Sequence, residues 1–323
     1  MFNKQIPLSL HSNYRIGGPA SLFFIATRIE DIVAAVSEAK KLKEPLFILG
    51  GGTNLLIPDA GFKGVMLKPA ITSLERIEGS RIRVGAGVLV STLNYFTVRQ
   101  GLTGLEWSGG LPGTVGGAVY GNAGAFGGEI KDSVVEVLSL DIAGAEPKLI
   151  RRTNPECQFS YRNSIFKSRT LEGTDQAAPG YAPPKEIILE VIFQLAPGLS
   201  TDINAGVHEK IDYRIARQPL DYPNIGSTFK NIPVTNVPEA VLKQYEHKIK
   251  QDPFPVLPTA VLISEAGLKG TKSGGAMISD KHPNFIVNLG GAKSEDVRAL
   301  AQTIKDTLHQ RYGVDLEREV IFL

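Results

Sequence analysis

The sequence is poor in cysteine and has no long apolar run. Cys157 is the only cysteine among 323 residues, which excludes a disulfide framework and is typical of a protein in a reducing compartment. No apolar stretch reaches the length of a secretory signal peptide or of a transmembrane helix. We therefore expect a cytoplasmic protein without membrane insertion.

Charge runs and metal-site patterns are also missing. The chain has 35 basic and 33 acidic residues, and no basic run forms the cationic face of a nucleic-acid-binding protein. The five histidines include no pair with the spacing of a zinc-protease motif. We therefore expect neither a nucleic-acid partner nor a catalytic metal. Nothing near Cys157 marks it as a reactive thiol, so we interpret it as a small buried hydrophobe.

Two common nucleotide-binding motifs are absent. In the nearest match to G-x-G-x-x-G, Gly85 and Gly87 are followed by Val90 where the third glycine belongs. Residues 267–273 have the wrong spacing for a Walker phosphate loop. A Rossmann NAD domain and a P-loop are therefore disfavoured.

Glycine is present in clusters, and the first cluster begins a candidate phosphate loop. Residues 46–49 are apolar and predict a buried strand that runs into Gly50-Gly51-Gly52-Thr53-Asn54. The backbone amides of this loop can surround phosphate oxygens, although a tight turn is the alternative. A helix is predicted before the strand, with Thr27 and Glu30 as a capping box and Pro45 ending it.

The second glycine cluster is longer and more specific. Residues 107–128 contain nine glycines and one proline, which predicts a long loop without regular structure. Small residues over this length indicate main chain laid against a flat or extended ligand.

The remaining pattern predicts strands first and helices later. Strands are expected within 65–90 and at 134–140, 148–152 and 187–195, with a helix at 89–99 and an exposed loop at 169–185. Helices are expected at 203–216, 238–250 and 260–266. The last helix is predicted to begin with Ser294 as its cap and to end at Gly313, before a strand at 314–323.

Five motifs together carry a resemblance to a known family. The loop at 50–54 and GLPGTVGGAVYGNAGAFGGEI at 110–130 resemble the FAD-binding domain of the vanillyl-alcohol-oxidase type. Tyr-Arg-Asn-Ser-Ile-Phe-Lys at 161–167, Gly-Ser-Thr-Phe-Lys-Asn at 226–231 and Arg-Glu-Val at 318–320 are similar to the UDP-N-acetylenolpyruvoylglucosamine reductase family. The similarity covers essentially the whole chain.

The resemblance implies an α+β fold. A FAD-binding region of two α/β subdomains would occupy 1–68 and 69–200, and an α+β substrate-binding domain would occupy 201–312. The strand at 313–323 would return to the FAD-binding region.

The resemblance also implies non-covalent FAD as cofactor, NADPH as co-substrate and a UDP-amino sugar as substrate, in a protein that we expect to be a monomer. In this family the first loop cradles the flavin pyrophosphate and the second runs along the flavin. The implied cofactor-binding residues are Gly50, Gly51, Gly52, Thr53, Asn54, Leu55, Gly113, Thr114, Gly116, Gly117, Asn122, Ala123 and Gly124.

Three catalytic roles follow from the resemblance. Arg162 would hold the enolpyruvyl carboxylate and stabilise the developing enolate, Ser227 would donate the proton, and Glu319 would assist at the enolate. The residue types alone also permit a solvated arginine, a helix-capping serine and an exposed, ion-paired glutamate. The implied substrate-binding residues are Tyr161, Arg217, Lys230, Asn231 and His282, with Lys269 and Lys272 as weaker candidates.

Some features depart from the family pattern. Asn163 stands where many relatives have aspartate, and Glu265 stands where glutamine is frequent. A tyrosine-bearing substrate loop has no counterpart between Leu195 and Arg217, so the chain resembles the shorter subgroup. The alternatives are a flavin oxidase or dehydrogenase acting on an alcohol or sugar, and a binding module without turnover.

Overall fold

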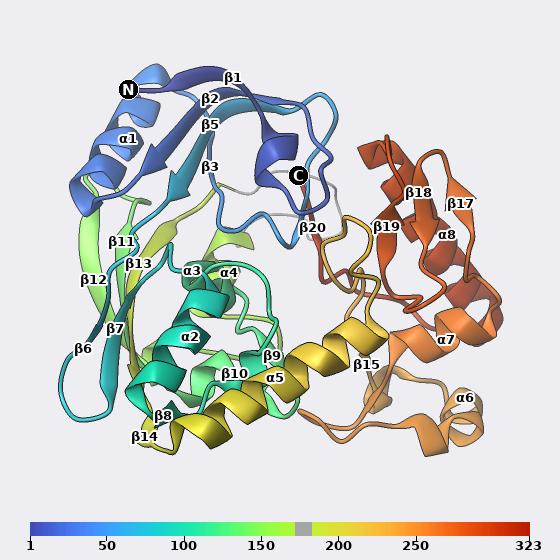
Figure 1. The fold of residues 1–323 in the computed structure, drawn as a ribbon. Helices are drawn as coiled ribbons and strands as arrows, with labels where there is room; N and C mark the ends of the chain where they lie inside the picture. Colours follow the sequence, from blue (N-terminus) through green and yellow to red (C-terminus); the bar gives the residue numbers. More distant parts are fainter. Residues whose placement is uncertain (172–182) are drawn as a thin grey trace. The chain divides into compact units, whose positions relative to one another are not determined.

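The computed structural model describes residues 1–171 and 183–323 (Figure 1). Mixed helices and strands confirm the expected α+β class. The chain divides into two compact units: unit 1 comprises residues 1–6, 19–51 and 62–214, and unit 2 comprises residues 7–18, 52–61 and 215–323. Most of the loop expected at 169–185 lies outside the described residues.

Unit 1 contains a four-stranded sheet covered by a helix. The strand order is β1-β2-β5-β3, and β5 runs parallel to both β2 and β3. Ile32, Ala35 and Val36 of the helix are buried in the core against this sheet. The bounds are β1 (Asn3–Pro7), β2 (Pro19–Ala26), α1 (Ile29–Leu42), β3 (Leu46–Ile48) and β5 (Phe62–Pro69).

The start of α1 differs from the predicted capping box. The cap position is Arg28, whose backbone is extended and whose side chain makes no capping hydrogen bond. The helix begins two residues after Thr27, so Glu30 occupies its second position and cannot close the box. Glu30 and Asp31 instead place negative charge in the first turn, where the helix dipole favours it.

A five-stranded antiparallel sheet forms the rest of unit 1. Its order is β12-β11-β13-β7-β6. Leu189 of β13 enters the core shared with α1, whereas Val191 and Phe193 enter a second core with α2, α3 and α4. A register shift in the pairing of β13 with β11 between Ile188 and Glu190 causes this change of face, because an extra residue in a strand reverses the alternation of its side chains. The bounds are β6 (Leu74–Arg76), β7 (Arg81–Gly85), α2 (Val90–Gln100), α3 (Val115–Tyr120), β11 (Val134–Asp141), β12 (Lys148–Thr153), α4 (Ile165–Leu171) and β13 (Glu186–Gln194).

The second glycine cluster is more regular than the sequence predicts. It contains a 3-10 helix (Glu106–Ser108), α3, and a hairpin of β9 (Gly124–Ala125) and β10 (Gly128–Glu129). Thr114 begins α3 by accepting the amide of Gly117 at 3.4 Å. The prediction of a loop without regular structure was therefore wrong, because capping and tight packing override the low helix propensity of glycine. Two further short strands pair in unit 1: β8 (Leu102–Thr103) and β14 (Ala196–Pro197).

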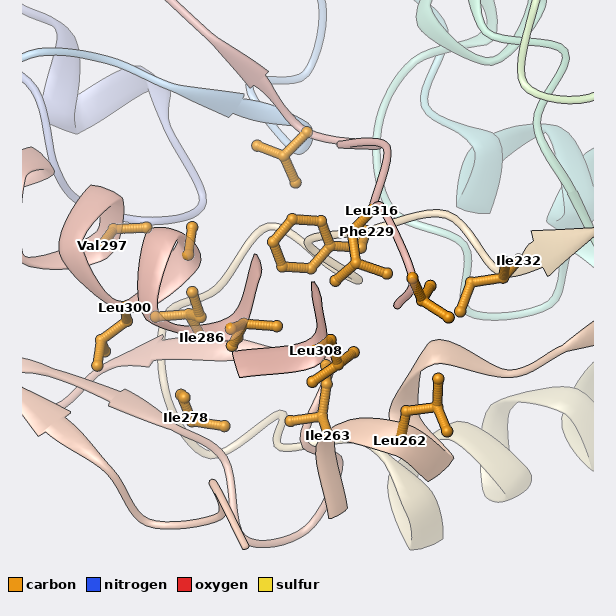
Figure 2. Packing of buried hydrophobic residues seen from close by; sticks show 14 of the residues in the cluster. Phe229, Ile232, Leu262, Ile263, Ile278, Ile286, Val297, Leu300, Leu308 and Leu316 are labelled. Carbon is orange, nitrogen blue, oxygen red and sulfur yellow. The ribbon is translucent and has the colours of Figure 1, made fainter. Parts of the chain in front are cut away.

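Unit 2 has its own core, in which α7 and α8 pack with the antiparallel sheet β17-β18-β19. Figure 2 shows Phe229 among Leu262, Ile263, Ile286 and other apolar side chains of this core. The bounds are β4 (Leu55–Leu56), β15 (Ile232–Pro233), α6 (Glu239–Gln244), β16 (Val256–Leu257), α7 (Thr259–Glu265), β17 (Lys272–Ser273), β18 (Ala276–Ile278), β19 (Ile286–Asn288), α8 (Ser294–Tyr312) and β20 (Ile321–Phe322). Helix α5 (Ser200–Arg217) leads into this unit.

Three boundaries in unit 2 correct the sequence predictions. Helix α6 ends at Gln244, and a 3-10 helix (Glu246–Lys248) follows it in place of one long helix. Ser294 is the first residue of α8 and not its cap, because its amide and hydroxyl bind the carboxylate of Asp59 at 2.8 and 2.7 Å. The final strand is limited to β20, which pairs in parallel with β4. Among the described residues, no helix combines the length and the apolar character needed to cross a membrane.

Candidate active site

The first glycine loop presents backbone amides without acceptors. In the described part of the chain, the N–H groups of residues 50–54 donate to no protein acceptor. Gly52 has φ +66°, and a Cβ on it would lie 2.0 Å from the carbonyl oxygen of His11, so only glycine fits. Consecutive unpaired amides are the donor set that binds a phosphate or diphosphate. The loop therefore fits the pyrophosphate of FAD.

The two glycine clusters lie against each other within unit 1. A Cβ on Gly51 would stand 2.7 Å from Cα of Gly113, and a Cβ on Gly50 would stand 3.1 Å from Oγ1 of Thr114. The structure thus brings together the two loops that the sequence assigns to one cofactor. Gly116 is equally constrained, because its Cβ would stand 2.8 Å from that of Ala86.

Asn122 connects the second cluster to the turn that carries Arg162. Its side chain is fully buried, and Nδ2 donates to the carbonyl of Ser160 at 3.0 Å and to the Glu129 carboxylate at 3.2 Å. Ser160 and Asn163 exchange backbone hydrogen bonds of 3.1 and 3.0 Å, which closes the turn. Arg162 lies in this turn with φ +54°. A positive φ is strained for arginine, and such strain is concentrated at functional sites.

A second guanidinium lies near Arg162. Arg214 of α5 is 8% exposed, and its Nε donates to the carbonyl of Gly109 at 2.8 Å. Burial lowers the pKa of Arg214, and the charge of Arg162 lowers it further. In the described part of the chain, Nη2 of Arg214 has no hydrogen-bond partner. Two cations at this place favour a bound anion.

The hairpin tip at Phe126 lies against Arg214. Phe126 and Gly127 form a two-residue turn with φ +53° and +82° between paired Ala125 and Gly128. The Phe126 ring lies 5.2 Å from Cζ of Arg214. An aromatic residue is rare at this turn position, where glycine or asparagine is usual. The strained backbone of Phe126 indicates that its contact with Arg214 is retained for function.

In unit 2, Ser227 and Glu319 lie on paired segments. The amide of Glu319 donates to the carbonyl of Thr228 at 3.0 Å, and the amide of Lys230 donates to the carbonyl of Glu317 at 3.0 Å. Ser227 and Glu319 are both half-buried. Among the described residues no helix begins at Ser227, so the helix-cap interpretation of this serine is wrong.

The end of the first glycine loop is hydrogen-bonded to the segment that carries Glu319. Nδ2 of Asn54 donates to the carbonyl of Glu319 at 3.1 Å. The amide of Ile321 donates to the carbonyl of Asn54 at 3.1 Å, and Leu55 follows in β4, buried beside β20. A predicted cofactor loop and a predicted catalytic carboxyl are thus linked through backbone.

Comparisons with known proteins identify the family. The family model "FAD binding domain" matches residues 20–147, which contain both glycine clusters, and the model "UDP-N-acetylenolpyruvoylglucosamine reductase, C-terminal domain" matches residues 218–323. The UDP-N-acetylenolpyruvoylglucosamine reductase of Lachnoclostridium phytofermentans is 36% identical over 97% of this chain and 90% of its own length. The enzyme of that name from Geobacter sulfurreducens is 38% identical over 97% and 91%. The chain belongs to the UDP-N-acetylenolpyruvoylglucosamine reductase family.

A solved structure agrees with this assignment. The crystal structure of UDP-N-acetylenolpyruvylglucosamine reductase from Thermus caldophilus matches with a TM-score of 0.74 and 28% identity, over 100% of this chain and 99% of that one. The family membership confirms the resemblance found in the sequence and makes this chain a FAD-dependent oxidoreductase. The expected fold class, with a FAD-binding domain and a C-terminal domain, is confirmed as well.

The predicted substrate-binding residues are spread along the chain. The Tyr161 ring lies 5.3 Å from Cζ of its neighbour Arg162, and Arg217 is exposed at the end of α5. Lys230 is mostly buried and forms an ion pair with Glu317. Oδ1 of Asn231 accepts the amide of Thr259 at 3.4 Å, at the start of α7.

His282 is half-buried beside Phe285, with ring centroids 4.7 Å apart. Burial lowers its pKa to about 4, and the charges of Lys250 and Lys269 act in the same direction. The imidazole is therefore neutral at physiological pH.

Metal and thiol chemistry have no site in the described residues. The described part of the chain contains no group of three or more His, Cys, Asp or Glu side chains that could hold a metal ion. Cys157 is fully buried, and burial raises the pKa of its thiol to about 12. Its interpretation as a small hydrophobe is confirmed.

Two residues that contact or lie near the candidate site residues, Arg214 and Asn284, were not predicted from the sequence. Arg214 belongs to no local motif. Only the helical period of the buried residues in α5 could have indicated that it faces inward. Asn284 is 2% exposed and hydrogen-bonds to Thr228 and Phe229. Those partners are more than fifty residues away in sequence, so no local signal reveals the contact.

Proposed function

We propose that this chain reduces the enolpyruvyl group of UDP-N-acetylenolpyruvoylglucosamine to give UDP-N-acetylmuramate, a step of peptidoglycan precursor synthesis in the cytoplasm. NADPH is the co-substrate that supplies the hydride. The pairing between the segment that follows Ser227 and the segment that carries Glu319 supports this proposal most directly. It holds a hydroxyl and a carboxyl donor one residue apart in register.

The FAD-binding role belongs to unit 1 and the first glycine loop. The amides of residues 50–54 would bind the pyrophosphate oxygens, and residues 113–124 would hold the flavin. When bound and reduced, FAD supplies a hydride to the enolpyruvyl double bond.

Arg162 binds the enolpyruvyl carboxylate. A planar guanidinium can donate two parallel hydrogen bonds to a carboxylate, and this interaction strengthens as negative charge builds up in the transition state. The turn closed by Ser160 and Asn163 fixes the backbone of Arg162 in advance. This preorganisation lowers the cost of orienting the arginine during the reaction.

Ser227 donates the proton that completes the reduction. Its hydroxyl hydrogen passes to the substrate carbon that carries the enolate charge, and the serine is then reprotonated from solvent. Glu319 donates a hydrogen bond to the enolate oxygen, which stabilises charge on the substrate before the proton arrives. Both residues act within unit 2, on the two paired segments.

The nucleotide part of the substrate is bound by Arg217, Lys230 and Asn231. Cations and an amide suit a diphosphate, because each can donate charge-assisted hydrogen bonds. Tyr161 and neutral His282 complete the proposed substrate contacts, with hydroxyl and imidazole groups that discriminate by hydrogen bonding.

A spectral titration tests this function. The purified protein is expected to be yellow, NADPH without oxygen is expected to bleach the flavin band, and the enolpyruvyl UDP-sugar is expected to restore it. A colourless protein that takes up no FAD would contradict the flavin assignment. Bleaching without recovery would favour a flavin oxidoreductase with another substrate.

A further inference from the structure

Asn284 makes three hydrogen bonds to the two residues that follow Ser227. Its carbonyl accepts the amide of Thr228 at 2.7 Å, its Oδ1 accepts the amide of Phe229 at 3.1 Å, and its Nδ2 donates to the carbonyl of Phe229 at 2.8 Å. All three residues are nearly inaccessible, with exposures of 2% for Asn284, 4% for Thr228 and 1% for Phe229. The contact is therefore buried and directional.

These bonds complete the backbone pairing of the segment. The fourth polar group of Thr228 and Phe229, the Thr228 carbonyl, accepts the amide of Glu319 at 3.0 Å. Asn284 and Glu319 thus satisfy all four backbone polar groups of these two residues. Buried backbone groups must be paired, so this segment has no alternative position of similar free energy.

The packing of Phe229 supports the same conclusion. Its ring lies in the core of unit 2 (Figure 2) and anchors the segment there, while the hydrogen bonds of Asn284 fix the main chain. Asn284 itself is anchored by its neighbour Phe285, which is 4% exposed. Ser227 directly precedes these two fixed residues, so the position of its backbone is fixed with theirs.

We propose that Asn284 is a positioning residue of this enzyme, which sets the place of the Ser227 hydroxyl and its register with Glu319. The proposal rests on the proposed proton-donor role of Ser227. Asn284 touches neither substrate nor cofactor in this role. Its side chain works through the main chain of Thr228 and Phe229.

Replacement by aspartate isolates the effect of the amide. Asn284→Asp retains the size and the acceptor for the Phe229 amide, but it places a carboxylate oxygen against the Phe229 carbonyl where Nδ2 donated. The repulsion displaces the segment. A displacement of a catalytic group by about 1 Å can cost about 10²-fold in rate.

Asn288 provides a matched control. It is 5% exposed, its Nδ2 donates to the carbonyl of Tyr14 at 2.9 Å, and its Oδ1 accepts the amide of Gly290 at 2.8 Å. The same substitution, Asn288→Asp, therefore breaks the same kind of buried backbone contact in unit 2. It involves neither Thr228 nor Phe229.

The experiment measures the two half-reactions separately by stopped-flow absorbance. For Asn284→Asp we expect an unchanged rate of flavin reduction by NADPH and a roughly 10- to 10²-fold slower reoxidation by the enolpyruvyl substrate. The solvent deuterium isotope effect on reoxidation should increase, because proton donation becomes slower. Asn288→Asp should lower the thermal unfolding temperature but leave reoxidation unchanged.

A double variant separates positioning from general damage. In a Ser227→Ala background, Asn284→Asp should add little further loss, because the hydroxyl that it positions is already gone. Equal slowing by Asn284→Asp and Asn288→Asp, or full additivity with Ser227→Ala, would overturn the proposal. If Asn284→Asp does not fold, Asn284→Ser, which retains one donor and acceptor, is measured with the same expected pattern.

The proposed function and this inference fail in different ways. Normal reoxidation in Ser227→Ala would remove the proton-donor assignment, and with it the reason to position that serine. Slow reoxidation in Ser227→Ala together with normal reoxidation in Asn284→Asp would leave the function standing and remove the role of Asn284.

Discussion

The amide of Glu319 donates to the carbonyl of Thr228 across 3.0 Å, which fixes the proposed carboxyl relative to the residue next to Ser227. The two segments are 91 residues apart in sequence, as their numbers show. Their pairing fixes the two backbones relative to each other, so only side-chain rotation changes the distance between the Ser227 hydroxyl and the Glu319 carboxyl.

Replacing Ser227 by alanine should separate the two half-reactions. Flavin reduction by NADPH should continue, while substrate reduction should slow by about 10²- to 10⁴-fold, the usual contribution of a general acid. Stopped-flow measurement of flavin absorbance checks both steps. Thr235→Ala is the control, because this exposed hydroxyl lies in the same unit. Unchanged reoxidation in Ser227→Ala would mean that the serine is structural.

Replacing Arg162 by alanine should slow substrate reduction by about 10²- to 10³-fold, as expected for loss of a charge stabiliser. Arg151→Ala removes an exposed arginine paired with Glu136 and serves as the control. Addition of guanidinium to Arg162→Ala should recover part of the rate. If Arg162→Ala reduces the substrate at the normal rate and guanidinium has no effect, Arg162 has no role in the reaction.

Replacing Glu319 by alanine should slow substrate reduction by about 10²- to 10³-fold, the usual cost of losing one hydrogen-bond donor to a developing oxyanion. Glu319→Gln, which retains a hydrogen-bond donor, should lose less. Asp315→Ala, at an acidic residue that is 89% exposed beside His309, should leave the rate as it is. Equal rates in Glu319→Ala and Asp315→Ala would remove Glu319 from the reaction.

The stability of the protein should depend on His282 in acid. The ordinary pKa of histidine is 6.5, and burial lowers that of His282 to about 4. The unfolded chain therefore binds this proton more readily, so stability is fully present above pH 6.5 and is lost as the pH falls toward 4. This difference in pKa corresponds to at most about 3 kcal/mol in the free energy of unfolding. In His282→Phe, urea unfolding should show a correspondingly smaller loss between these pH values, and an identical loss would contradict the assignment.

The glycine clusters and the short motifs could be found in the sequence, but the contacts that surround them could not. Glycine clusters and short motifs are local, so the two loops could be assigned to one cofactor before their contact at Gly51 and Gly113 was known. Hydrophobic periodicity likewise predicted α2 and the strands of the five-stranded sheet.

What could not be predicted depends on long-range contacts. Asn284 shows no pattern in sequence, because its partners at Thr228 and Phe229 come from a distant segment. Helix α3 forms in a glycine-rich stretch because Thr114 caps it and Gly116 packs on Ala86. Tertiary packing of this kind overrides local propensity.

The first glycine loop allows a controlled test of FAD binding. Gly52 and Gly79 both have positive φ, +66° and +57°, so alanine is strained at either position. A Cβ at Gly52 would lie 2.0 Å from the carbonyl oxygen of His11, whereas a Cβ at Gly79 has nothing within 4 Å. Gly52→Ala must therefore move the loop whose amides are proposed to bind the pyrophosphate, and Gly79→Ala leaves that loop in place. We expect Gly52→Ala to be purified with little FAD, measured as the ratio of flavin to protein absorbance, and Gly79→Ala to retain its full content. Equal FAD content in the two variants would show that this loop does not hold the cofactor.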